Sequence, residues 1–186
     1  MKNKNEIIVF GGGCFWCTEA IFSMLNGVIK VTPGYSGGVT KNPSYKEVCS
    51  GETGHAEVIK VEFDPSKIKL SKLLKVFFTS HDPTTPNKQG NDLGSQYRSI
   101  ILYTNEKQKE EIEKYIKKIK YNFENLVVTQ VQELEEFYSA EDYHKDYFEK
   151  NPLNPYCMLV INPKLKKSKK NFQNLLKNKI LTITTN

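Results

Sequence analysis

The 186-residue sequence predicts an α+β fold, in which helices pack on a sheet and the whole chain forms a single domain. Three observations support this prediction. Segments with strand-like and helix-like spacing of apolar residues alternate along the chain, which favours a sheet covered by helices. The length suits one hydrophobic core. Apolar residues make up 38% of the chain and charged residues 26%, which is the composition of an ordinary globular protein.

Six segments have the composition of strands. They are 6–10, 28–35, 56–63, 97–103, 127–133 and 157–161. In the third segment, residues two apart point to the same side, so Glu57 lies on the apolar face of the strand. That face also holds Ile59, Val61 and Phe63. A carboxyl group that heads an apolar face is partly desolvated, so we expect its pKa to be raised and Glu57 to be able to donate a proton. The alternative is a carboxylate at a strand end that simply reaches water.

Six helices are expected between and after these strands. They cover 15–25, 44–50, 70–80, 105–121, 140–149 and 164–178. Apolar residues three and four apart give the longer ones a single buried face. Examples are Leu70, Leu73, Leu74 and Phe77 in the third helix, and Ile112, Ile116 and Ile119 in the fourth. Pro163 stands at the position that proline favours at the start of the last helix.

The net charge of +6 is concentrated at one end of the chain. Residues 163–186 contain seven lysines and no acidic residue, whereas the remainder holds 20 basic and 21 acidic side chains. A solvated helix face is the simplest interpretation, with weak attraction of nucleic acid or of an acidic partner as the alternative. No apolar run approaches the roughly 18 residues of a membrane span. The apolar run near the N-terminus is too short for a secretory signal, so we expect a cytoplasmic protein.

The segment 11–17, with the sequence GGGCFWC, carries the clearest chemical signal. An apolar strand leads into three glycines, and a helix is expected to start at the first cysteine. A thiol at a helix start faces unpaired N–H groups and the positive end of the helix dipole, which predicts a lowered pKa for Cys14. Helical spacing places Cys14 and Cys17 at the top of a core face, whereas Phe15 and Trp16 point elsewhere and can form a pocket wall.

Other interpretations of the four cysteines stay open at this point. Cys14 and Cys17 could be buried structural residues, or a thioredoxin-like redox pair, although the bulky Phe-Trp between them is unusual for such a pair. In a cytosolic chain, cysteines are more often catalytic or metal-binding than disulfide-forming. The three histidines have no convincing metal spacing with the cysteines, so we expect no metal site.

Two further stretches are candidates for the site. Residues 82–96 are rich in proline, glycine, asparagine and aspartate and are too long for a simple connector, so they predict a binding loop that carries Asp92 and leads to Tyr97. Asp92 could also be an ordinary turn residue. Cys157 follows a turn at 151–156 and could approach another thiol.

Taken together, these segments resemble the peptide methionine sulfoxide reductases of type A. The matching stretches are 13–16 (GCFW), 34–38 (GYSGG), 42–51 (NPSYKEVCSG), 53–57 (TGHAE), 81–83 (HDP), 89–92 (QGND) with Gly94, 96–99 (QYRS), 140–144 (AEDYH), 151–152 (NP) and 156–157 (YC). They occur in the family's order and cover about residues 5–162. Each is a modest signal, but the set is specific. The basic segment 163–186 lies outside the resemblance.

The resemblance implies a fold, a reaction and roles for residues. The fold would be an α/β sandwich with a ferredoxin-like core, and the chain a single catalytic domain. Cys14 would attack the sulfur of the S epimer of methionine sulfoxide, free or in proteins, while Phe15 and Trp16 hold its methyl group. Glu57, Tyr45 and Tyr97 would bind the sulfoxide oxygen, with Glu57 as proton donor and Asp92 ordering the site.

The resemblance also implies how the enzyme is recycled. Cys14 would become a sulfenic acid, a second thiol would condense with it to a disulfide, and thioredoxin would reduce that disulfide. A cysteine after Asn-Pro and Tyr commonly resolves the sulfenic acid in this family, which points to Cys157. Cys17 is the alternative, since a bond to Cys14 within one helical turn needs local distortion. Cys49 is expected to be a buried small hydrophobe. The family uses no metal and no organic cofactor, and a monomer is expected.

Two other functions compete with this one. A general disulfide oxidoreductase would work through Cys14 and Cys17, although the thioredoxin active-site sequence is missing. A module that binds nucleic acid or an acidic partner would use the lysines of 163–186, but it leaves the Cys-Phe-Trp segment without a role.

Overall fold

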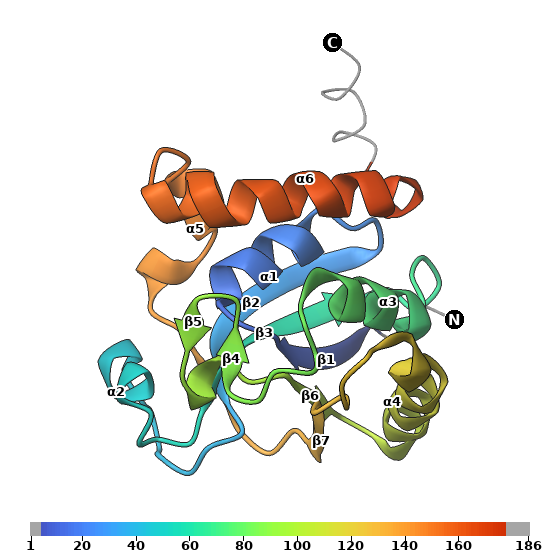
Figure 1. The fold of residues 1–186 in the computed structure, drawn as a ribbon, viewed down its shortest axis with the longest axis horizontal. Helices are drawn as coiled ribbons and strands as arrows, with labels where there is room; N and C mark the ends of the chain where they lie inside the picture. The colour runs from blue at the N-terminus through green and yellow to red at the C-terminus, as the bar shows by residue number, and fades with distance from the viewer. Residues whose placement is uncertain (1–4, 178–186) are drawn as a thin grey trace.

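A six-stranded mixed sheet organises the molecule (Figure 1). The structure, a computed structural model, describes residues 5–177. The strands lie in the order β7-β6-β1-β3-β2-β8. Their bounds are β1 Glu6–Gly11, β2 Val28–Ser36, β3 Ala56–Phe63, β6 Ile100–Tyr103, β7 Gln130–Glu133 and β8 Phe137–Ser139. Only β6 and β7 pair in parallel among these strands. The prediction of a sheet with helices packed on it is therefore confirmed.

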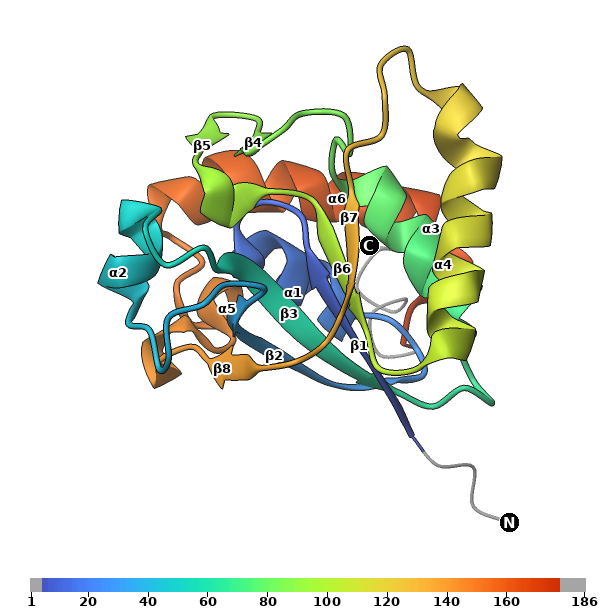
Figure 2. The same cartoon turned by 90° about the horizontal axis from the view of Figure 1, so that it is seen from below.

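The helices gather mainly on one side of this sheet (Figures 1 and 2). They are α1 Phe15–Ser23, α2 Tyr45–Ser50, α3 Leu70–Ser80, α4 Glu106–Ile119, α5 Tyr147–Lys150 and α6 Asn162–Asn171. α1 packs on β2 and β3, and α6 lies across the outer side of α1 and α3. Because α6 starts directly after the segment of Cys157, this arrangement brings the C-terminal part of the chain back over the start of α1.

Alternation along the strands separates two cores. The larger one lies under the helices and receives Ile59, Val61 and Phe63 from β3. The smaller one, on the opposite face, receives Ala56 and Val58. Glu57 belongs to the helix-covered face, because its carboxylate accepts a hydrogen bond from the start of α1. The predicted placement of Glu57 at the head of the apolar face is confirmed.

Several predicted elements differ from the structure. The segment 157–161 is not a strand but a π-helix, Cys157–Ile161. The predicted helix 140–149 is broken into a 3-10 turn, Asp142–His144, and the short α5, with Asp146 at φ 54° between them. β8 was not predicted, and Tyr97 ends a 3-10 turn rather than starting a strand. The last helix begins two residues early and ends at Asn171, before a 3-10 turn at Gln173–Leu175. Residue 178 of that prediction lies outside the described part.

The predicted loop 82–96 has structure of its own. It contains a small hairpin of β4, Lys88–Gln89, and β5, Asp92–Leu93, which pair in antiparallel fashion. Figure 1 shows this hairpin beside the N-terminal end of α1. The hairpin therefore holds Asp92 close to the segment that carries the first two cysteines. Separately, none of the helices within residues 5–177 has the length and the apolarity that crossing a membrane requires.

Candidate active site

A tight turn between β1 and α1 delivers Cys14. Gly13 has φ +91°, and a Cβ on it would lie 2.6 Å from Cγ of Gln89 in the β4–β5 hairpin. Glycine is therefore required both by the left-handed backbone and by the close approach of the hairpin. Cys14 is the N-cap of α1, and its carbonyl oxygen accepts a hydrogen bond from the Cys17 N–H at 3.1 Å. The predicted helix start at the first cysteine is confirmed.

Glu57 lies beneath this helix start. Its side chain is 1% exposed, and its Oε2 accepts a hydrogen bond from the Phe15 N–H at 3.0 Å. Burial is the main reason why the pKa of Glu57 is raised to about 8, and the Phe15 hydrogen bond opposes that shift only in part. At neutral pH the carboxyl group is therefore mostly protonated, as its place on the strand predicted. A neutral carboxyl group at this position can donate a proton to a bound molecule.

The predicted lowering of the Cys14 pKa is wrong. Cys14 is buried, and this burial raises its pKa well above the usual value. The hydrogen bond of its thiol with Cys17 and the negative charge of Glu57 raise it further, whereas a backbone hydrogen bond from Trp16 opposes the change. The effect of the helix start is present, but desolvation outweighs it.

Cys17 carries the opposite shift. The hydrogen bond from the Cys14 thiol lowers the pKa of Cys17, and the positive charge of Lys164 on α6 and a hydrogen bond from Tyr156 act in the same direction. The two thiols are therefore in contact and electrically coupled, with the negative charge favoured on Cys17. Cys157, at the start of the π-helix, is fully buried, and burial followed by the charge of Cys17 raises its pKa.

Aromatic rings form a wall around the start of α1. Phe15 is buried among other rings, including that of Tyr45 at 6.4 Å between centroids. Trp16 is only partly buried, and it lies flat on Tyr147 with centroids 3.6 Å apart and planes 5° apart. Its Nε1 donates a hydrogen bond to Nδ1 of His144 at 3.0 Å. The expectation that Phe15 points away from the core is therefore wrong, because its ring is fully buried in the main core. The role of Phe15 and Trp16 in a pocket wall stays a prediction.

Two tyrosine hydroxyls are coupled to Glu57. Tyr45 begins α2, and Tyr97 ends the 3-10 turn Ser95–Tyr97. Burial, followed by the charge of Glu57, raises the pKa of both tyrosines, so both remain neutral donors. The Tyr97 pKa also responds to the charge of Cys14. These couplings bring Tyr45, Tyr97, Glu57 and Cys14 into one site, although they come from four separate parts of the chain.

Cys49 departs from its predicted role as a buried hydrophobe. It is exposed, because the six-residue α2 turns only Val48 fully into the core. Its thiol is hydrogen-bonded to the Tyr45 side chain, and partial burial raises its pKa.

Asp92 reaches the site through Tyr156. Its Oδ2 accepts a hydrogen bond from the Tyr156 hydroxyl at 2.9 Å. Tyr156 in turn contacts Cys17 and precedes Cys157 in the chain. Asp92 also raises the pKa of Glu57. The hairpin acid therefore links the first two cysteines to the segment of the third one.

Some residues of the site were not assigned from the sequence. They are Tyr147 and His144, which contact Trp16, and Tyr156, which is hydrogen-bonded to Asp92. Glu141 is the fourth. Its carboxylate accepts hydrogen bonds from the Tyr35 hydroxyl at 2.7 Å and from the Tyr45 N–H at 2.9 Å. The stretches 140–144 and 156–157 had been matched to the family, which is the signal that could have identified three of them. Within residues 5–177, no three His, Cys, Asp or Glu side chains are grouped so that they could hold a metal ion.

The fold and this arrangement of thiols, a protonated carboxyl group and an aromatic wall define a thiol-dependent oxidoreductase. A family model described as peptide methionine sulfoxide reductase matches residues 6–176. The chain belongs to the peptide methionine sulfoxide reductase family, and it is an enzyme of that class.

Individual relatives agree with this assignment. A protein of Sulfolobus acidocaldarius named "Peptide methionine sulfoxide reductase MsrA" is 58% identical over 167 residues, which is 90% of this chain and 95% of that protein. The crystal structure of reduced Mxr1 from Saccharomyces cerevisiae is similar with a TM-score of 0.79 at 37% identity, covering 83% of this chain and 90% of that one. Mxr1 in complex with Trx2 is similar with a TM-score of 0.56 at 25% identity, covering 77% and 85%.

Proposed function

We propose that this enzyme reduces the S epimer of methionine sulfoxide, free and in proteins, and so repairs oxidative damage. The observation that carries the proposal is the contact between the protonated Glu57 carboxyl group and the backbone next to Cys14. It places a proton donor beside a thiol, which is what removal of a sulfoxide oxygen requires. Phe15 and Trp16 supply apolar surface for the methyl group.

In the first step, the Cys14 sulfur attacks the sulfoxide sulfur as its own proton leaves to Cys17. The hydrogen bond between the two thiols is the contact through which this proton can leave. Glu57 protonates the sulfoxide oxygen, which Tyr45 and Tyr97 also bind through their hydroxyl groups. The S–O oxygen is transferred to Cys14 as a sulfenic acid, and methionine leaves in reduced form. Asp92 orders the site by holding Tyr156.

In the second step, another thiol condenses with the sulfenic acid, forming a disulfide and releasing water. We propose Cys157 for this role, with Cys17 as the alternative. The effect of the Cys17 charge on the pKa of Cys157 supports the first choice, and the contact of Cys17 with Cys14 supports the second. Both are compatible with a sequence in which Cys17 reacts first and Cys157 then displaces Cys14 from the disulfide.

Thioredoxin then reduces the disulfide by exchange, and the protein needs no metal or organic cofactor. The complex of the related Mxr1 with Trx2 supports this part of the proposal. We infer further that residues 1–186 act as a single catalytic domain, a cytoplasmic monomer that engages neither nucleic acid nor a membrane. Its ferredoxin-like core would be β1-α1-β2-β3-α3-β6, since these strands lie in the order β6-β1-β3-β2.

The test of the activity is the reduction of a peptide that contains methionine-S-sulfoxide, followed by chromatography with thioredoxin as reductant. Cys14→Ser is expected to abolish the reaction, and Ser66→Ala, in the turn after β3, is the control that keeps it. Turnover of the R epimer only, or normal multiple turnover by Cys14→Ser, contradicts the proposal.

The test of the resolving thiol is a pulse of one equivalent of substrate followed by mass spectrometry of the disulfide. In a second measurement with excess substrate and thioredoxin, Cys157→Ser is expected to release about one methionine per enzyme and then to stop. A 14–17 disulfide that supports continued turnover in Cys157→Ser assigns the role to Cys17 instead.

A further inference from the structure

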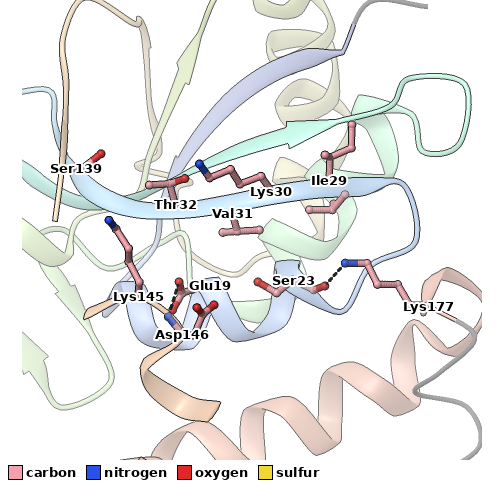
Figure 3. A pocket seen from close by; sticks show the side chains of 11 residues that line it. Glu19, Ser23, Ile29, Lys30, Val31, Thr32, Ser139, Lys145, Asp146 and Lys177 are labelled. Carbon is pink, nitrogen blue, oxygen red and sulfur yellow. Dashed lines mark hydrogen bonds between the residues drawn. The ribbon is translucent and has the colours of Figure 1, made fainter. Parts of the chain in front are cut away.

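Glu19 is a buried carboxylate on α1 with no role in the proposed chemistry. Its side chain is 3% exposed, and it lies in the same helix as Cys17 and Trp16. It lines a cavity of about 410 Å³ together with Ser23, Thr32, Lys145 and others, away from the residues that surround Glu57. Figure 3 shows that the carboxylate points at Asp146, at the rim of this cavity.

The carboxylate of Glu19 binds the backbone that starts α5. Its Oε1 accepts a hydrogen bond from the Asp146 N–H at 3.0 Å, and the Tyr147 N–H is a second donor. Asp146 has φ 54°, the left-handed conformation that few non-glycine residues adopt. The hydrogen bonds that Glu19 accepts therefore tie this left-handed turn to α1.

The residue after this turn is the one that lies on the tryptophan. Tyr147 stacks on Trp16 with centroids 3.6 Å apart, and His144, on the other side of the turn, accepts the Trp16 Nε1–H. Trp16 and Glu19 are three residues apart in α1, so one turn of helix carries both the indole and the group that positions its partner. Rotation of the turn around Asp146 would displace both contacts of Trp16.

We propose that Glu19 is a positioning residue, which sets the orientation of Trp16 by fixing the turn at Asp146 and thus the ring of Tyr147. The proposal rests on the proposed function, in which Trp16 holds the methyl group of the substrate. Glu19 itself touches neither the substrate nor a reacting atom. Its action is expected in substrate binding rather than in the chemical step.

Burial of Glu19 has an energetic consequence that fits such a role. Desolvation is the main cause that raises its pKa to about 7, and the charge of Asp146 adds to it, whereas the backbone hydrogen bonds and Lys150 oppose it. A carboxylate in such surroundings is stable only because it is well hydrogen-bonded. An apolar residue at this position would pack in α1 but would leave the N–H groups of the turn without an acceptor.

The test uses two variants of nearly the same size. Glu19→Met removes the acceptor without leaving a cavity, and Glu19→Gln keeps an acceptor oxygen. Trp16 is the only tryptophan of the chain, so its fluorescence reports its surroundings directly. Glu19→Met is expected to change the emission in the same direction as Tyr147→Ala, whereas Glu19→Gln keeps the wild-type emission. The double variant with Tyr147→Ala is expected to change it no further.

Kinetics with a methionine-S-sulfoxide peptide give the second measurement. Glu19→Met is expected to raise KM roughly tenfold, which is the effect of losing one hydrogen bond to a charged group. The value of kcat is expected to change less than about twofold. Ser23→Ala, in the same helix and cavity, is the control and keeps both values. Unchanged emission in Glu19→Met, or additive effects in the double variant, overturns the proposal. Because emission is measured without substrate, these outcomes are distinct from a failure of the proposed reaction.

Discussion

Burial sets the protonation of two residues of the site, and for Glu57 it changes the state that the group has in water. Cys14 is held as a thiol, and Glu57 is held as a neutral acid up to about pH 8. The site thus stores a proton on the acid, and of the two thiols Cys17 is the one that ionises more readily, next to the proposed nucleophile. Neither state follows from the helix dipole alone, since desolvation is the larger effect at both positions.

The role of Glu57 predicts a particular pH profile. Glu57→Gln keeps an acceptor for the Phe15 N–H but has no proton to give, so the single-turnover rate at pH 7 is expected to fall by about 10² to 10⁴. In the wild type this rate is expected to decline above pH 8 as Glu57 ionises. Rapid-quench measurement of methionine release from pH 6 to 9 checks both expectations.

The control for this measurement is Glu62→Gln. Glu62 lies on the same strand as Glu57 but on the opposite face of the sheet, where its carboxylate accepts a hydrogen bond from Asn5. It is expected to keep the wild-type rate. A wild-type rate for Glu57→Gln would remove the acid role of Glu57.

At the scale of elements, α2 is short and depends on its cap. The Ser44 hydroxyl accepts a hydrogen bond from the Glu47 N–H, and the Glu47 carboxylate accepts one from the Ser44 N–H. Both hydrogen bonds of a capping box are therefore present. The helix of six residues buries little apolar surface, and helices of this length are not stable on their own. The position of Tyr45, its first residue, therefore depends on a local contact at the surface.

Loss of that cap predicts a local rather than a global effect. Ser44→Ala is expected to weaken α2 by about 1 kcal/mol, to speed amide exchange in residues 45–50 and to slow sulfoxide reduction a few-fold. Hydrogen exchange and single-turnover rates measure this. Ser66→Ala, which removes a hydroxyl from the turn after β3, is the matched control. Global loss of stability without faster local exchange would contradict the prediction.

Local patterns predicted the elements that have one buried face. The alternation in β3 and the 3.6-residue spacing in α3 and α4 were sufficient to predict these elements, because an element with one buried face has a periodic pattern of apolar residues. The run Cys157–Ile161 was misjudged because a short apolar run fits a strand or a helix equally well. The structure buries its two ends, Cys157 and Ile161, and exposes Met158 and Leu159 between them.

Whole-molecule contacts explain what the sequence could not supply. Cys14, Glu57 and the aromatic pair Phe15–Trp16 stand in local patterns and could be named from them. The stacking of Tyr147 on Trp16, the bond of Tyr156 to Asp92 and the raised pKa of Cys14 arise only when distant segments meet. Burial of this kind depends on segments that are far apart in the sequence, so it cannot be deduced from the neighbouring residues of the chain.

The buried acids predict how the stability of the whole molecule depends on pH. Folding raises the pKa of Glu57 to about 8 and of Glu19 to about 7, so the folded state binds more protons than the unfolded state near neutrality. The free energy of unfolding is therefore expected to fall between pH 6.5 and 8, by about 1 to 2 kcal/mol per pH unit. Buried His81, with a pKa lowered to about 4, destabilises the fold only on the acid side of this window.

Urea unfolding at several pH values measures this slope. Glu57→Gln is expected to remove most of it, because a group that does not titrate contributes nothing to the linkage. Stability that increases from pH 6.5 to 8 in the wild type would contradict the raised pKa values.

The distribution of the cysteines has a practical consequence. Cys14, Cys17 and Cys157 are buried, and Cys49 is exposed. A bulky aromatic disulfide reagent added to the native protein is expected to label Cys49 first and the three buried sulfurs more slowly. Under oxidative attack, Cys49 is also the sulfur that meets a dissolved peroxide first, while burial shields the other three thiols from the medium.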